Sequence, residues 1–213
     1  MTSGKRAAFD KDHSRYETWF ERHQKAYYAE LLAVRAFLPY YGLCIEIGVG
    51  TGRFGGPLGI RVGLDPSAPM LRYAEKRGIL CVQGVAEALP FRDSLFNCAL
   101  VVTTICFVDD SKALFSEAYR ILKPRACLIV GFIDRNSPLG KLYQSARAEN
   151  IFYRDATFYS PDEVEKLLSD AGFLGQVWGQ TLFQPLEGMR EIEPLREGLS
   201  EGAFVIVKAY KAR

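Results

Sequence analysis

The 213-residue sequence lacks the features that mark several large protein classes. No apolar run approaches the roughly 18 residues that a membrane-spanning helix requires, and the charged N-terminal segment has no apolar centre of the kind found in secretory signals. The 27 basic and 25 acidic residues nearly cancel, so the chain lacks the concentrated positive charge of a nucleic-acid-binding protein. These absences predict a cytoplasmic protein with no membrane partner and no nucleic-acid partner.

The sequence also lacks paired cysteines. Its five cysteines are odd in number and show no C-x-x-C spacing. They lie in or beside apolar runs, which favours small buried side chains in the reduced state. We therefore expect no bound metal and five free thiols, at Cys44, Cys81, Cys98, Cys106 and Cys127.

Short apolar runs recur along the chain, with helical segments between them. The first five runs lack apolar/polar alternation, as expected of strands that are buried on both faces of a parallel sheet. No helix separates the last two runs, which therefore predict an antiparallel hairpin. The expected fold is α/β and doubly wound, a mostly parallel seven-stranded sheet of the Rossmann-like type with a C-terminal antiparallel hairpin. The predicted strands are residues 43–47, 60–64, 79–82, 98–102, 127–132, 176–183 and 203–209.

A single domain is expected over residues 1–213, because no linker or internal repeat divides the chain. An N-terminal helical cap is predicted at about 12–38, and a loop insertion in the C-terminal hairpin at about 184–202. The segment 53–61 is short and rich in glycine and proline, which predicts a reduced first crossover helix. The other predicted helices are residues 68–76, 112–122 and a segment that starts at Ser160 with a capping box.

A glycine-rich turn follows the first predicted strand, in the sequence EIGVGTG at 46–52. Gly48, Gly50 and Gly52 let the backbone approach a ligand, and the next helix presents its amides to an anionic group. The spacing differs from the G-x-G-x-x-G of dinucleotide sites, and Glu46 would repel a pyrophosphate by about 4 kcal/mol at roughly 4 Å. S-adenosylmethionine has no phosphate and carries two positive groups and one carboxylate, so it fits both features. The alternative is a tight turn without a ligand.

An acidic residue ends the second predicted strand. Asp65 stands about 17 residues after Gly48, a position suited to accepting hydrogen bonds from ribose hydroxyls. Met70 lies one helical turn beyond Ser67 and can cover an adenine face. Each has an ordinary alternative, because Asp65 can cap the helix that begins near Ser67 and Met70 can belong to the core.

Four motifs in this order resemble the class I S-adenosylmethionine-dependent methyltransferases, especially the small type 11 group. They are EIGVGTG at 46–52, GLDPSAPML at 63–71, GVAEALPF at 84–91 and RILKP at 120–124, so the resemblance covers nearly the whole chain. It implies an enzyme that transfers a methyl group from S-adenosylmethionine. It places Gly48, Gly50 and Gly52 around the methionine portion, Asp65 on the ribose and Ala86 with Glu87 near the adenine. The other predicted cofactor-site residues are Tyr16, Glu46, Pro66, Met70 and Thr103.

The sequence departs from the family pattern at two places. Val85 stands where many relatives have an aspartate that recognises the adenine amino group, so that contact must come from elsewhere. Arg125 and Ala126 replace the usual glycine pair after the proline of RILKP, which alters a turn remote from the chemistry.

The acceptor side of the site is less clearly marked. The segment 103–109 has no histidine, so no general base is assigned. No [DN]-P-P-[YF] segment of the amino-methylating nucleic-acid enzymes is present, which favours a small-molecule acceptor with an N or O nucleophile. The aromatic N-terminal helix and the loop 184–202 are expected to form the acceptor pocket, although an aromatic core stripe and a solvated loop are the alternatives. The substrate candidates are Trp19, His23, Tyr27 and Thr104.

Two other functions stay open from the sequence. A non-catalytic S-adenosylmethionine-binding sensor or scaffold would bind the cofactor without methyl turnover. An NAD-dependent oxidoreductase is poorly supported, because the glycine turn lacks the dinucleotide spacing.

Overall fold

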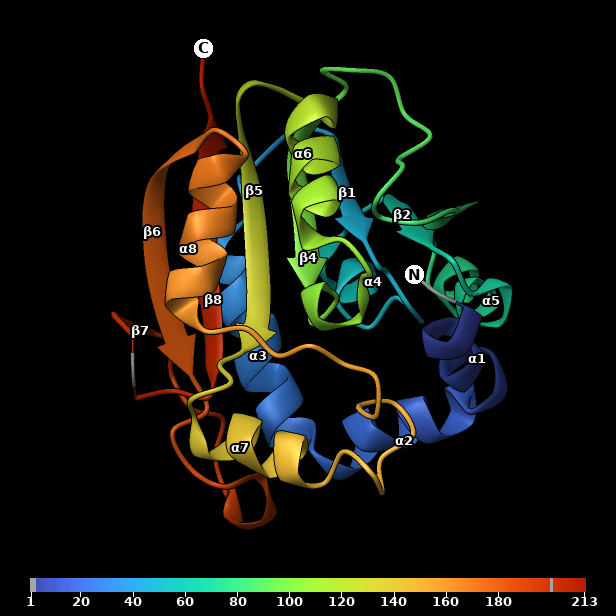
Figure 1. The fold of residues 1–213 in the computed structure, drawn as a ribbon, viewed down its shortest axis with the longest axis vertical. Helices are drawn as coiled ribbons and strands as arrows, with labels where there is room; N and C mark the ends of the chain where they lie inside the picture. Colours follow the sequence, from blue (N-terminus) through green and yellow to red (C-terminus); the bar gives the residue numbers. More distant parts are fainter. Residues whose placement is uncertain (1–2, 200) are drawn as a thin grey trace.

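The computed structural model describes residues 3–199 and 201–213. Within them, eight strands form one sheet in the order β3-β2-β1-β4-β5-β8-β6-β7 (Figure 1). Pairing is parallel from β3 to β5, and β8 then pairs antiparallel with both β5 and β6. The predicted α/β class, with a mostly parallel sheet and a C-terminal antiparallel hairpin, is confirmed.

The elements follow the predicted alternation of strands and helices. The strands are β1 (Cys44–Ile47), β2 (Val62–Asp65), β3 (Leu80–Gln83), β4 (Phe96–Val102), β5 (Leu122–Ile133), β6 (Phe173–Thr181), β7 (Arg196–Glu197) and β8 (Phe204–Lys211). The helices are α1 (Ser3–Lys11), α2 (His13–Arg22), α3 (Gln24–Phe37), α4 (Gly55–Leu58), α5 (Ala68–Lys76), α6 (Ser111–Ile121), α7 (Pro138–Ser145) and α8 (Pro161–Asp170).

The N-terminal region differs from the predicted single helix. Residues 12–38 form two helices, α2 and α3, because His23 leaves the helical conformation, with φ −113° and ψ 44°. The backbone N–H of His23 still donates to the carbonyl of Trp19 at 2.9 Å, so α2 is closed before the chain turns. The helix α1 precedes α2, and the sequence did not predict it. The described N-terminal region therefore consists of three separate helices, α1, α2 and α3, instead of one.

The segment between β6 and β8 is not entirely a loop. The two-residue strand β7 pairs with β6 at Gly179 and Gln180 and adds an eighth strand at the sheet edge. The side chain of Gln180 also accepts hydrogen bonds from the backbone N–H groups of Glu201, at 2.9 Å, and Gly202, at 2.7 Å. These bonds fix the return of the chain into β8.

The crossover helix after the glycine turn is reduced, as predicted, because α4 has only four residues. The helices α5, α6, α7 and α8 begin instead at side-chain caps, which satisfy backbone amides that have no partner within the helix. The capping residues are Ser67, Asp110, Ser137 and Ser160, the last in a full capping box with Glu163.

Both faces of the sheet are buried. Along β4, Ala99 and Val101 belong to the hydrophobic cluster beneath α6 and α8, whereas Cys98, Leu100 and Val102 belong to the cluster that includes α3. Figure 1 shows α6 and α8 in front of the sheet and α1, α2 and α7 below it, where β4 and β5 end. Because ligands bind beyond the carboxyl ends of parallel strands, these three helices enclose the expected site.

All five cysteines are free thiols, and Cys98, Cys106 and Cys127 are buried. Among the described residues, no cluster of three or more histidine, cysteine, aspartate or glutamate side chains is placed to hold a metal ion. Nor is any helix of the described chain long and apolar enough to cross a membrane.

Candidate functional site

The glycine turn after β1 has a backbone that other residues adopt only with strain. Gly48, Gly50 and Gly52 have φ values of 78°, 52° and 80°, in the left-handed region that favours glycine. At Gly48 the space is also closed, because a Cβ atom there would lie 2.2 Å from the Thr104 side chain. The turn therefore brings bare backbone to the end of the strand, next to the start of α4.

Glu46 lies directly before this turn and is almost completely buried, with 1% of its surface exposed. Its Oε2 has no hydrogen-bond partner in the described chain. Burial raises the pKa of Glu46 to about 8, against the lowering effect of the Gly55 backbone N–H, and the charge of Asp65 adds to the rise. A buried oxygen without a partner beside a glycine cradle fits a ligand that brings an ammonium group.

Asp65 ends β2 and holds the glycine turn from the neighbouring strand. Its Oδ2 accepts a hydrogen bond from the backbone N–H of Gly50 at 3.0 Å, and its Oδ1 accepts one from Ser67 at 2.9 Å. Burial raises the pKa of Asp65 to about 6, against the opposite effect of these two N–H groups. Each carboxylate oxygen accepts about two hydrogen bonds, so both can still receive a hydroxyl from a ligand. Asp65 can therefore hold the glycine turn and the residue that caps α5 and still bind a ligand.

A cavity of about 60 Å³ lies between the glycine turn and the start of α5. It is lined by predicted cofactor residues from several elements, and Glu87 is held there because its Oε1 accepts the backbone N–H of Asp109 at 2.8 Å. The predicted residues in this lining are Tyr16, Gly48, Gly50, Asp65, Pro66, Met70, Ala86, Glu87, Thr103 and Thr104. The structure therefore brings together ten residues from five separate segments of the sequence.

Glu46 and Gly52 are the predicted cofactor residues that do not line this cavity. Gly52 packs against α5, where a Cβ atom would lie 3.1 Å from the Cα of Ala74. Its role in the turn is close helix packing. Thr104, which we predicted on the acceptor side, instead lines the small cavity, and its hydroxyl donates to the carbonyl of Val102 at 3.0 Å.

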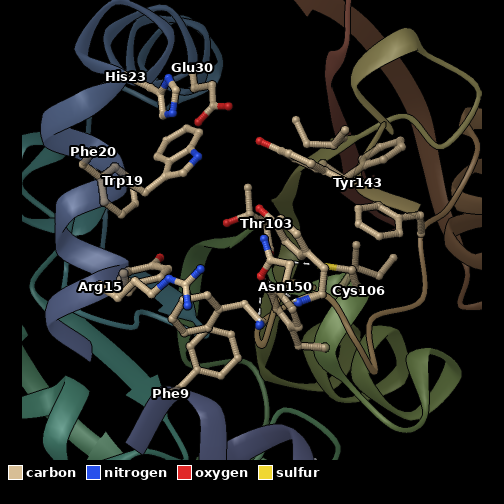
Figure 2. Close-up of a pocket in the computed structure, with 18 of the residues that line it drawn as sticks. Phe9, Arg15, Trp19, Phe20, His23, Glu30, Thr103, Cys106, Tyr143 and Asn150 are labelled. Carbon is tan, nitrogen blue, oxygen red and sulfur yellow. Dashed lines mark hydrogen bonds between the residues drawn. The ribbon is translucent and has the colours of Figure 1, made fainter. Parts of the chain in front are cut away.

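A second cavity of about 520 Å³ adjoins the first. It is lined mainly by aromatic side chains of α1, α2, α7 and the segment after α7, as Figure 2 shows. Four residues, Phe9, Tyr16, Thr103 and Phe107, line both cavities. Thr103 has φ 51°, an uncommon conformation for a β-branched residue, and such strain concentrates at functional sites.

The acceptor-pocket predictions are partly matched by this cavity. Trp19 and His23 line it, with ring centroids 5.2 Å apart, whereas Tyr27 does not. Tyr27 is buried in the core and donates a hydrogen bond to the carbonyl of Arg53, so it supports the turn.

We predicted that the loop 184–202 forms a second wall of the acceptor pocket. This prediction is wrong for this cavity, because no described residue of 184–202 lines it. The chain pairs this segment with β6, and Leu186 and Met189 pack outside the α2–α3 junction beside Gln24 and Lys25. The helix α7 and residues 150–159 form the wall instead.

Sequence analysis missed several residues of this cavity, notably Glu30, Tyr143, Asn150 and Tyr153. Tyr143 and Tyr153 stack with ring centroids 4.5 Å apart, and burial raises the pKa of both hydroxyls. The sequence could have indicated Glu30, because it is an acidic residue among the apolar residues that form the buried face of α3. The segment 143–159 carries no comparable pattern.

A glycine cradle at the end of β1, an acidic residue at the end of β2 and a large adjoining cavity define a Rossmann-like enzyme that binds a nucleoside cofactor. The buried carboxyl of Glu46 matches a cofactor with a positive end and conflicts with one that has a pyrophosphate.

Comparison with known proteins identifies this cofactor class. Residues 45–130 match the family model of a methyltransferase domain. A crystal structure from Thermotoga maritima, of an S-adenosylmethionine-dependent methyltransferase described as a possible histamine N-methyltransferase, is 47% identical with a TM-score of 0.94. The alignment covers 96% of this chain and 99% of that one.

Two sequence relatives add to this result. An uncharacterised protein of Methanocaldococcus jannaschii is 39% identical over 95% of this chain and 98% of its own length. The demethylmenaquinone methyltransferase of Roseiflexus castenholzii is 30% identical over 63% of this chain and 69% of its own length. The chain belongs to the S-adenosylmethionine-dependent methyltransferases, and S-adenosylmethionine is its cofactor. The oxidoreductase and non-catalytic alternatives are thereby set aside.

Proposed function

We propose that this methyltransferase acts on a small molecule that binds in the 520 Å³ cavity and presents an N or O nucleophile. The observation that carries the proposal is the shared lining of the two cavities, which puts an enclosed, aromatic space directly beside the glycine turn. Cavities of about 300–1,000 Å³ are typical of small-molecule sites. The names of the Thermotoga and Roseiflexus relatives both contain a small-molecule methyl acceptor, which supports a small molecule as the acceptor of this chain.

The chain's own residues divide the work of holding the cofactor. Gly48 and Gly50 give the methionine portion close access to backbone, and Glu46 provides a carboxylate for its ammonium group. Asp65 accepts hydrogen bonds from the ribose hydroxyls. Pro66 and Met70 lie beside the adenine on the α5 side, and Ala86 and Glu87 lie on the other.

The residues at the junction of the cavities orient the acceptor and exclude water. When bound, S-adenosylmethionine supplies a methyl group that bonds to the acceptor's lone pair while the carbon–sulfur electron pair stays on sulfur, and the acceptor's surplus proton goes to water. Such a displacement depends mainly on alignment, and holding two reactants in line contributes roughly 7–11 kcal/mol in favourable cases. Phe9, Tyr16 and Phe107 surround that position with apolar surface, and Thr103 lies between the two cavities.

Incubation with S-adenosylmethionine carrying an isotope-labelled methyl group and a pool of small metabolites tests the proposal. We expect label in one or a few small products and none in added tRNA, DNA or protein. Cofactor binding with no labelled small molecule across such a panel, or label in a macromolecule alone, would contradict it. Trp19→Ala serves as a variant of the acceptor cavity, and it should retain cofactor affinity within about threefold because Trp19 does not line the small cavity.

A further inference from the structure

Glu30 is the acidic residue in the described lining of the large cavity, and nothing in the sequence motifs assigns it a role. It lies on α3 with 3% of its surface exposed. The other buried residues of α3 are all apolar or aromatic, namely Ala26, Tyr27, Ala29, Leu31, Ala33 and Val34. In Figure 2 the Glu30 carboxyl lies beside His23 and Trp19, at the end of the view opposite Phe9.

Among the residues that the structure describes, no positive side chain pairs with the carboxyl of Glu30. Burial raises its pKa to about 8, and neither a hydrogen bond nor an arginine or lysine contributes to that pKa. An acid in such a place costs several kcal/mol when ionised and unpaired, so a bound cation would relieve a substantial penalty. Burial raises the pKa of Tyr143 and Tyr153, and the nearby Glu30 carboxyl adds to both shifts.

The walls around Glu30 also suit a cation with an apolar body. Trp19 and Tyr143 present aromatic rings to the cavity, and cation–π attraction adds about 0.5–2 kcal/mol. The basic groups of the described lining are Arg15 and Arg22, which are exposed, and His23, which is half-buried. Besides Glu30, its other titratable groups are Tyr16, Cys106, Tyr143, Tyr153 and Tyr159. Solvent screens the two arginines, whereas Glu30 acts in a low-dielectric interior. The inner end of the cavity therefore selects for positive charge.

We infer that the methyl acceptor carries an ammonium group on an aromatic or apolar body, and that Glu30 binds this ammonium as the residue that determines specificity. The inference deepens the proposed function and rests on it. An ammonium nitrogen has no lone pair, so a second N or O atom of the same molecule accepts the methyl group, at the Thr103 end of the cavity. Glu30 is a positioning residue in this arrangement, because it holds the acceptor without touching the methyl group.

Three probes of similar size test this inference by calorimetry, with the protein saturated with S-adenosylhomocysteine. They are 2-phenylethylamine, 2-phenylethanol and 3-phenylpropanoate, which carry an ammonium, a neutral hydroxyl and a carboxylate on the same body. We expect the wild-type protein to bind the amine at least about 10-fold more tightly than the alcohol, and the carboxylate no better than the alcohol, as one charge-assisted contact predicts. Equal binding of amine and alcohol, or no binding of any probe, overturns the inference without any variant.

Glu30→Gln keeps the shape of the side chain and removes its charge. It should reduce the preference for the amine to less than about threefold while S-adenosylhomocysteine affinity is unchanged, because Glu30 lies outside the small cavity. Glu21→Gln is the matched control, since Glu21 is an exposed acid on α2 that does not line the large cavity, and it should retain the full preference. A preference that survives Glu30→Gln, or disappears equally in Glu21→Gln, contradicts the inference. Methyl transfer to an uncharged small acceptor would leave the proposed function standing and remove the role of Glu30.

Discussion

The carboxylate of Asp65 is hydrogen-bonded to the backbone N–H of Gly50 at 3.0 Å, so the end of β2 holds the glycine turn that follows β1. The other oxygen of Asp65 accepts the N–H of Ser67, which begins α5. One side chain therefore connects two neighbouring strands and a helix before any ligand binds. This arrangement orients the carboxylate toward the cavity where the ribose is proposed to bind.

Asp65→Ala should weaken S-adenosylmethionine binding by about 10-fold or more, because charge-assisted hydrogen bonds contribute roughly 1.5–3 kcal/mol. Isothermal calorimetry measures this loss. Asp110→Ala is a suitable control, since Asp110 also caps a helix, with Oδ1 3.0 Å from the N–H of Ala113, but lies outside both cavities. Unchanged affinity for Asp65→Ala, or an equal loss for the control, would exclude the proposed ribose contact.

Glu46→Gln should discriminate between two ligands. S-adenosylmethionine has an ammonium for the buried carboxyl, and adenosine does not, so the variant should lose affinity for the first by about fivefold or more and keep it for the second. Competition binding with both ligands measures the ratio. Equal losses would mean that Glu46 serves only the shape of the turn.

Glu17→Gln should loosen the cap over the cofactor site. The Glu17 carboxylate accepts hydrogen bonds from Arg53, at 3.2 Å to Nε, and from Arg77, at 2.7 Å to Nη2, so it fastens α2 to the glycine turn and to the end of α5. Phe9 of α1 and Tyr16 of α2 line the small cavity, so these helices cover the proposed cofactor site. We expect S-adenosylhomocysteine to dissociate about fivefold faster from the variant, as stopped-flow fluorescence would show. An unchanged dissociation rate would mean that α2 is not the barrier to entry.

Glu30 should make the unliganded protein less stable as the pH rises. Its folded-state pKa of about 8 is above the ordinary value of 4.5, so the folded protein holds a proton that the unfolded chain releases. The resulting penalty is small near pH 4.5, grows between about pH 5 and pH 8, and is then fully present. Glu30→Gln should therefore raise the free energy of unfolding by about 3 kcal/mol more at pH 7.5 than at pH 5. Urea unfolding at the two pH values measures the difference, and a pH-independent effect would contradict the buried ionisation.

The sequence alone predicted those parts of the fold that depend on residues close to one another in the chain. The apolar runs located the strands, and the capping box at Ser160 placed the start of α8. The glycine spacing predicted the turn after β1, because the left-handed conformation of these positions favours glycine itself. The break at His23 was missed, since residues 13–37 are helical on both sides and no proline or glycine marks the end of α2.

The acceptor cavity was harder to predict because tertiary packing brings its walls together. Tyr143 and Tyr153 lie 124 and 134 residues after Trp19 in the sequence, and no periodic pattern relates them. The segment 184–202 was an attractive second wall because it is long and charged. Its pairing with β6 holds it away from the lining of that cavity, and register of this kind depends on the whole sheet.

Phe9, Tyr16, Thr103 and Phe107 belong to both cavities, so neither ligand meets a surface independent of the other. A ligand that moves these four side chains changes the free energy with which the second ligand binds, and thermodynamic linkage makes the effect equal in both directions. The affinity of the acceptor is accordingly a property of the loaded enzyme. S-adenosylhomocysteine lacks the transferable methyl group and the sulfonium charge, so the four shared side chains contact a different cofactor after the reaction. The methylated product is therefore bound by a pocket that differs from the one that bound the unmethylated acceptor.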